Sequence, residues 1–104
     1  MRLQTVGIVG LGLIGGSLAL TLKRRTGLTV YGYDRDASAR EKAVSVGAVD
    51  RADGPLWECG AVFVALYPGA ACAYVHDHAK EMRPGAIVSD LCGVKRAVQR
   101  EMEP

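Results

Sequence analysis

The chain has 104 residues, of which 13 are basic and 11 acidic, giving a formal net charge of +2 at pH 7. This length suits one domain with its own core, and the dispersed basic residues, apart from Lys23-Arg24-Arg25, give no indication of a nucleic-acid partner. Three widely spaced cysteines without a Cys-x-x-Cys pair indicate neither a disulfide framework nor a zinc site, and favour a reducing cytoplasm.

The first predicted element is a strand over about residues 3–9, which leads into Gly10-x-Gly12-x-x-Gly15 and a helix over about residues 14–25. In such a turn Gly10 allows the tight bend, Gly12 lets the backbone approach a pyrophosphate, and Gly15 lets the helix pack closely on the strand. The free amides and the positive dipole end of the helix would face the phosphates. This segment therefore predicts a dinucleotide-binding loop.

The same stretch carries no charge between Arg2 and Lys23, so it is long enough to span a bilayer. Gly12-x-x-x-Gly16 also matches a transmembrane dimer motif. Against this alternative, five glycines lie in the stretch, and a membrane span would leave the strand pattern and the acid downstream unexplained. We expect a soluble domain without a membrane partner.

A second strand is predicted over residues 29–33, and Asp34 follows it, nineteen residues after Gly15. A carboxylate there can accept hydrogen bonds from both ribose hydroxyls of an adenosine, and it should repel the 2′-phosphate of NADP, so NAD is the expected cofactor. Arg35 could stack on adenine or meet a phosphate, which keeps NADP as a second possibility. The alternative role for Asp34 is a helix N-cap, for which Asp36 is better placed.

The next helix is predicted to begin near Asp36 and to stop at Gly47. A capping box of Ser38 and Glu41 offers a competing start. Its apolar face consists of Ala39, Ala43 and Val46.

Shorter apolar runs follow in an alternating pattern. The predicted elements are a short strand over 49–52, a single helical turn over 55–59, a buried strand over 61–66, a helix with Cys72, Val75, Ala79 and Met82 on one face, a strand over 86–90 and a terminal helix over 94–102. Strand and helix thus alternate throughout, which predicts an α/β fold: a Rossmann-like, doubly wound parallel sheet of about five strands in the order 3-2-1-4-5, within three αβα layers.

In this topology the cofactor should lie across the carboxyl ends of strands one and four, and the loop after strand five should approach its nicotinamide end. The predicted cofactor-binding residues are Gly10, Gly12, Leu13, Ile14, Gly15, Asp34, Arg35, Leu66, Tyr67, Cys92 and Gly93. Two roles are open for Tyr67, which packs either on the cofactor or within its own loop. His76 and His78 lie two residues apart, so they cannot form a metal pair on one helix face, and we expect surface histidines and no metal site.

Gly10-Leu-Gly-Leu-Ile-Gly-Gly-Ser17, followed by Gly32-Tyr-Asp-Arg35, resembles the amino-terminal NAD(P)-binding domain of the prephenate/arogenate dehydrogenase family. Ala65-Leu-Tyr-Pro-Gly69 and Ser89-Asp-Leu-Cys-Gly-Val-Lys95 resemble later segments of the same family. The resemblance implies NAD-dependent, or sometimes NADP-dependent, oxidative decarboxylation of prephenate to 4-hydroxyphenylpyruvate in tyrosine biosynthesis.

The resemblance also implies a catalytic histidine beyond the equivalent of Lys95, in a His-Pro-Met segment, and an arginine from a separate helical domain. The sequence reaches Pro104 before either, and Gly93 stands where many members carry a serine. We therefore assign no catalytic residue. Residues 1–104 are expected to be the dinucleotide-binding domain of a truncated enzyme that lacks the helical substrate and dimerisation domain, binds NAD, and does not oxidise prephenate alone.

A bare edge on the fifth strand would favour a homodimer. Prephenate or arogenate would bind only with the missing domain. The alternative functions are a non-catalytic nucleotide-binding or sensory module and another NAD(P)-dependent reductase of a small substrate, such as an imine or a 3-hydroxyacid.

Overall fold

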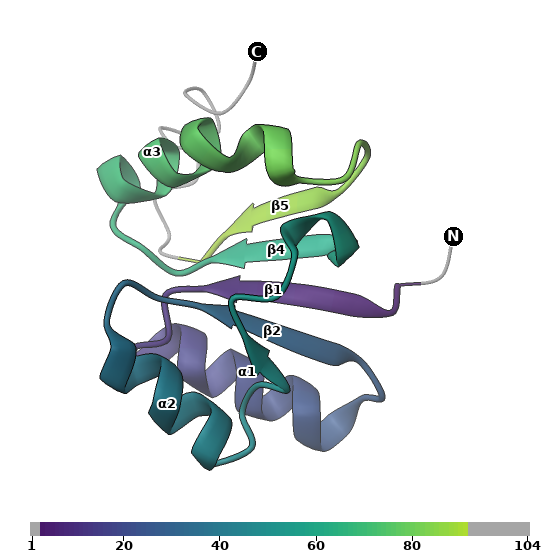
Figure 1. Cartoon of the computed structure of the whole chain (residues 1–104), viewed down its shortest axis with the longest axis vertical. Helices are drawn as coiled ribbons and strands as arrows, with labels where there is room; N and C mark the ends of the chain where they lie inside the picture. Colours follow the sequence, from purple (N-terminus) through teal and green to yellow (C-terminus); the bar gives the residue numbers. More distant parts are fainter. Residues whose placement is uncertain (1–2, 92–104) are drawn as a thin grey trace.

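Parallel strands form the centre of the computed structural model, which describes residues 3–91 (Figure 1). The strands are β1 (Thr5–Val9), β2 (Thr29–Tyr33), β3 (Arg51–Ala52), β4 (Ala61–Val64) and β5 (Ile87–Asp90). They lie in the order β3-β2-β1-β4-β5, and every neighbouring pair is parallel. The predicted fold class and strand order are confirmed.

Helices cover both faces of this sheet. They are α1 (Leu13–Arg25), α2 (Ala37–Ser45) and α3 (Pro68–His78), with two short 3₁₀ turns, η1 (Leu56–Glu58) and η2 (Ala79–Glu81). Figure 1 shows α1 and α2 together on one side of the sheet and α3 on the other. Within residues 3–91, no helix has both the length and the apolar character that a bilayer crossing requires.

Local chemistry explains where two of these helices begin. The side chain of Asp36 caps α2 by accepting a hydrogen bond from the Ser38 amide at 2.9 Å, which confirms Asp36 as the start over the competing capping box. Pro68 occupies the first turn of α3, where its missing N–H costs no helical hydrogen bond.

Alternate residues of each strand face two separate apolar clusters, as a sheet covered on both faces requires. The cluster beneath α1 and α2 contains Val6, Ile8, Leu11, Ala19, Val30, Ala43, Ala48, Val49 and Ala61. The cluster beneath α3 and η1 contains Val9, Tyr31, Tyr33, Leu56, Cys59, Val62, Val64 and Ala71. Each face of the sheet therefore carries its own apolar core.

Several predicted elements are longer than the observed ones. β1 begins at Thr5 and not at residue 3, because its pairing with β2 starts there. β4 ends at Val64, two residues before the predicted end, because the chain turns toward α3. The helix predicted to reach Met82 ends at His78, and a 3₁₀ turn follows it.

Val46 was predicted on the buried face of the second helix, and this prediction is wrong. The helix ends at Ser45, and Val46 is its C-cap with 56% of its surface exposed. Gly47 follows with φ of +76°, a left-handed conformation that turns the chain away from the helix axis. Ala48 and Val49 enter the core instead, so the third strand contains only Arg51 and Ala52.

A close backbone contact fixes the start of α1 against the end of β1. Gly10 has φ of +90°, and a Cβ atom added at Gly15 would lie only 1.8 Å from the Gly10 carbonyl oxygen. No side chain fits there. The packing role predicted for Gly15 is confirmed by this contact.

We predict that Gly15→Ala lowers the free energy of unfolding by about 2–3 kcal/mol, because α1 must move away from the turn to admit the methyl group. Gly16→Ala is the matched control. A Cβ atom at that position lies 3.4 Å from its nearest neighbour, the Leu11 carbonyl oxygen, and alanine is the better helix former by up to about 1 kcal/mol. Urea unfolding of both variants tests this difference, and equal stabilities would contradict it.

Candidate functional site

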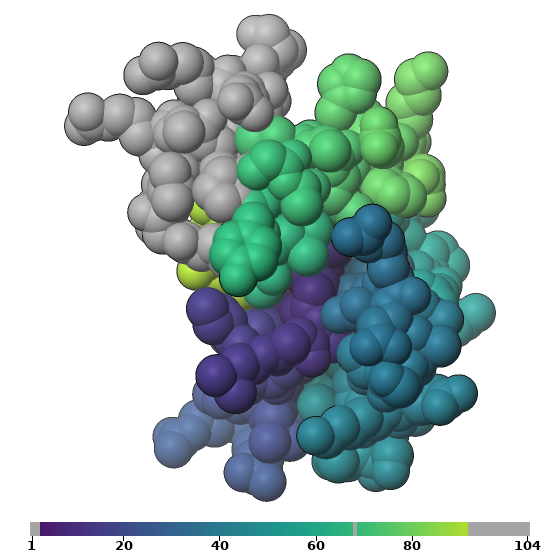
Figure 2. Space-filling model, turned by 90° about the vertical axis from the view of Figure 1, so that its left-hand side faces the viewer, coloured from purple at the N-terminus to yellow at the C-terminus, as the bar shows by residue number. Residues whose placement is uncertain are grey.

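A crevice of about 760 Å³ opens at the carboxyl edge of the sheet and runs beneath α3. Gly10, Asp34 and Leu66, which follow β1, β2 and β4, line the end of the crevice at this carboxyl edge. Figure 2 looks onto this edge: the glycine-rich loop, in purple, lies below the start of α3, in green, and beside the blue segment that follows β2. The space exists because β3 and β4 are joined by η1, a single 3₁₀ turn, where a full crossover helix would fill the face.

Hydrogen bonds join the glycine-rich loop to Asp34. The Leu11 amide donates to Oδ2 of Asp34 at 2.7 Å, and the Asp36 amide donates to Oδ1 at 2.9 Å. The Gly10 amide donates to the carbonyl of Tyr33 at 2.8 Å. An ionised carboxylate oxygen can accept two hydrogen bonds. Each oxygen of Asp34 therefore retains capacity for one further donor, such as each hydroxyl of a vicinal diol.

The start of α1 supplies the complementary positive end. Gly12 is the N-cap residue without a side-chain cap, and the first turn contains no acidic residue. The amides of that turn have no acceptor within the helix, and the helix dipole adds positive potential there. A Cβ atom added at Gly12 would meet no atom within 4 Å, so this backbone is open to a ligand. The arrangement is suited to an anion.

The structure brings some of the predicted site residues together and leaves others apart. Gly10, Asp34, Arg35 and Leu66 all line the crevice. Gly12 lies outside the crevice lining, at the start of α1, and Gly15 is buried below it. Leu13 and Ile14, also on this turn, are exposed, Leu13 to 89%.

Tyr67 precedes α3 and is 85% exposed, so it does not pack within its own loop. Contact between Tyr67 and a ligand stays a prediction. Cys92 and Gly93, together with the helix predicted over 94–102, lie outside the described residues.

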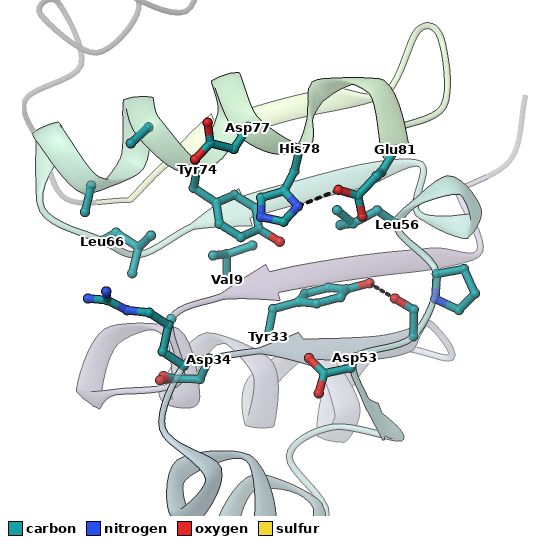
Figure 3. A pocket seen from close by; sticks show the side chains of 16 residues that line it. Val9, Tyr33, Asp34, Asp53, Leu56, Leu66, Tyr74, Asp77, His78 and Glu81 are labelled. Carbon is teal, nitrogen blue, oxygen red and sulfur yellow. Dashed lines mark hydrogen bonds and ion pairs between the residues drawn. The ribbon is translucent and has the colours of Figure 1, made fainter.

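The deeper part of the crevice contains polar side chains that were not predicted as site residues (Figure 3). Tyr33 lies on the sheet side, 8% exposed, and its hydroxyl donates to the carbonyl of Gly54 at 2.6 Å. Opposite it, the rings of Tyr74 and His78 stack with their centroids 4.2 Å apart. Nδ1 of His78 lies 2.6 Å from Oε2 of Glu81.

His78 keeps 37% of its side chain exposed, so it is a surface histidine as predicted, and it also lines the wall of the crevice. The i, i+4 spacing from Tyr74 places both rings on one helix face, and this was the available signal in the sequence. His76 is exposed, as predicted. Among residues 3–91, no group of three possible metal ligands comes together.

Burial keeps the phenols and the thiol of this region protonated. It raises the pKa of Tyr33 far above its ordinary value, and it raises the pKa of Tyr74 to about 12, with the charge of Glu81 adding to the effect. Burial also raises the pKa of the Cys59 thiol. These groups act at neutral pH as hydrogen-bonding and packing groups, not as charged nucleophiles.

Comparison with known proteins gives a consistent family and fold. The sequence model of a family described as "Prephenate dehydrogenase, nucleotide-binding domain" matches residues 18–104. Arogenate dehydrogenase from Synechocystis is 30% identical with a TM-score of 0.82, over 94% of this chain and 37% of that one. Prephenate dehydrogenase from A. aeolicus, solved with hydroxyphenyl propionate and NAD+, is 22% identical with a TM-score of 0.81, over 98% of this chain and 39% of that one.

The fold extends to a wider set of dehydrogenases. For example, 3-hydroxyisobutyrate dehydrogenase from Salmonella typhimurium is 24% identical with a TM-score of 0.65, over 95% of this chain and 39% of that one. The chain thus spans about two fifths of the length of each of these proteins.

We predict that Tyr33→Phe lowers the free energy of unfolding by about 1–2 kcal/mol, because the buried carbonyl of Gly54 loses its donor. Tyr31→Phe is the matched control. The Tyr31 hydroxyl bonds to Glu58, whose exposed carboxylate can bond to water instead, so the loss should stay below about 1 kcal/mol. Urea unfolding followed by circular dichroism tests both variants, and an equal loss in both would contradict the expectation.

Proposed function

The chain belongs to the prephenate dehydrogenase family, and from this premise we propose that it is the NAD-binding domain of an oxidoreductase that acts on prephenate or arogenate. The match to the family's nucleotide-binding domain and the 30% identity to an arogenate dehydrogenase support the proposal. The A. aeolicus relative, solved with NAD+, supports the choice of cofactor.

The observation that carries the proposal is the 2.7 Å hydrogen bond between the Leu11 amide and Asp34. It holds an anion-attracting helix start and a diol-accepting carboxylate side by side at one edge of the sheet. A dinucleotide presents a diphosphate next to an adenosine ribose, and this pair of groups matches it. The carboxylate would repel a 2′-phosphate, which favours NAD; Arg35, exposed in the crevice lining, keeps NADP as the second candidate.

When bound, the nicotinamide would accept the hydride from the substrate. The residues of this chain would bind and orient the dinucleotide: Gly12 and the first turn of α1 at the diphosphate, and Asp34 at the ribose.

The proposal also includes oxidative decarboxylation of prephenate as the activity of the enzyme, a reducing cytoplasm as its compartment, and a homodimer contact along β5. Ile87 on that edge strand is 63% exposed, which supports the contact.

We further propose that residues 1–104 bind the cofactor and do not oxidise prephenate by themselves. The resemblance places the general base in a His-Pro-Met segment, and neither His76 nor His78 is followed by proline. Both histidines lie in the last turn of α3, which begins after β4 and runs back away from the carboxyl edge of the sheet. A base there would not reach a substrate beside the nicotinamide.

We predict that Asp34→Asn weakens NAD binding at least tenfold, because a charged acceptor for the ribose hydroxyls is lost. Asp36→Asn is the matched control: it removes a neighbouring acid, but asparagine caps a helix as well as aspartate, so NAD affinity should not change. Isothermal titration of NAD into each variant measures the effect. Unchanged affinity in Asp34→Asn, or an equal loss in Asp36→Asn, would overturn the ribose role.

Incubation of the purified chain with NAD and prephenate should give no NADH absorbance, because no described residue is placed as the general base that accepts the hydroxyl proton. The same sample should still show NAD binding by titration. Steady NADH formation proportional to protein concentration would refute the proposal that the 104 residues are inactive alone.

A further inference from the structure

A second layer of contacts lies behind Asp34. Nη1 of Arg40, in the first half of α2, donates to the backbone carbonyl of Asp34. Nε of the same guanidinium lies 3.4 Å from Oδ2 of Asp53. Arg40 thus ties the end of β2 to the turn that follows β3, although Asp34 and Asp53 are nineteen positions apart in the sequence.

The Asp53 turn is itself held in place from both sides. Its amide donates to the carbonyl of Gly32 at 2.9 Å. The carbonyl of the next residue, Gly54, accepts a hydrogen bond from the hydroxyl of Tyr33 at 2.6 Å. Asp53 has φ of +58°, a conformation that glycine adopts at lower cost than aspartate. Glycine would fit position 53 at least as well as aspartate, which tolerates this conformation, and what the aspartate adds is a carboxylate beside Arg40.

The opposite end of β2 carries a contact of the same kind. Nζ of Lys23 donates to the carbonyl of Leu28 at 3.3 Å and pairs with Oδ1 of Asp50 at 2.9 Å. Each end of β2 is thus braced by one cation that bonds a backbone carbonyl and a carboxylate. Only the Arg40 brace touches a residue of the candidate dinucleotide site.

From this geometry we propose that Arg40 and Asp53 are positioning residues that hold the Asp34 carboxylate in place beside the glycine-rich loop. They would thereby increase the affinity of the site for the adenosine ribose. This inference rests on the proposed function. The Asp34 carboxylate is fixed through two amides, but those amides restrain it only while its own backbone stays in place. Arg40 supplies that backbone restraint, and Asp53 holds the guanidinium in position.

The test is a double-mutant cycle read by isothermal titration of NAD into the 104-residue chain. Arg40→Met should lower NAD affinity about fivefold in the native background and less than about twofold in the Asp34→Asn background, because it acts through that carboxylate. Arg40→Lys should recover part of the loss. Asp53→Asn, which tolerates the left-handed turn and removes only the negative charge, should lower affinity about twofold.

Lys23→Met is the matched control, because it removes the equivalent brace from the other end of β2. It should lower stability to a similar extent as Arg40→Met and leave NAD affinity unchanged. The inference is overturned if Arg40→Met has no effect on NAD affinity, if its effect is equal in the two backgrounds, or if Lys23→Met reproduces it.

The same titrations separate this inference from the proposed function. If the native chain does not bind NAD, or Asp34→Asn binds it normally, the proposed function fails and the inference falls with it. If Asp34→Asn loses affinity and Arg40→Met does not, only the positioning role is refuted.

Discussion

The contact between Gly15 and the carbonyl of Gly10 is the constraint on which the remaining geometry depends. It places the start of α1 directly against the end of β1, at a distance that no side chain allows. The preceding turn then presents the Leu11 amide to Asp34, and the amides of the first helical turn face the open edge. One backbone contact thus sets both the positive end of the site and the orientation of its acid.

The two faces of the sheet have different tasks. The face beneath α1 and α2 is filled by small and branched aliphatic side chains, and α2 supplies Arg40 behind the acid. The other face has α3 and only a short turn beside it, so Tyr33 lies on the floor of the crevice that runs beneath α3. The side of the sheet beneath α2 therefore supports the backbone of Asp34, and the side beneath α3 contains the crevice.

The sequence predicted the features that depend on neighbours along the chain. The glycine spacing, the apolar strand runs and Asp36 gave α1, β2 and the start of α2, and strict alternation of strands and helices gave the strand order. The features it missed depend on contacts between distant segments. The bond from Tyr33 to Gly54 and the pairing of Arg40 with Asp53 join different elements, and neither produces a periodic pattern, although the Asp53-Gly54 dipeptide is a turn signal.

The short length of β3 has a consequence for how this domain could open. Two residues alone pair this strand with β2, whereas β1, β2, β4 and β5 pair over four or five. Local fluctuations begin where the fewest hydrogen bonds must break, so this outer margin should separate before the centre of the sheet does. The Asp53 turn directly follows β3. Separation of β3 from β2 would therefore lower the affinity for a bound ligand while the rest of the domain stayed folded.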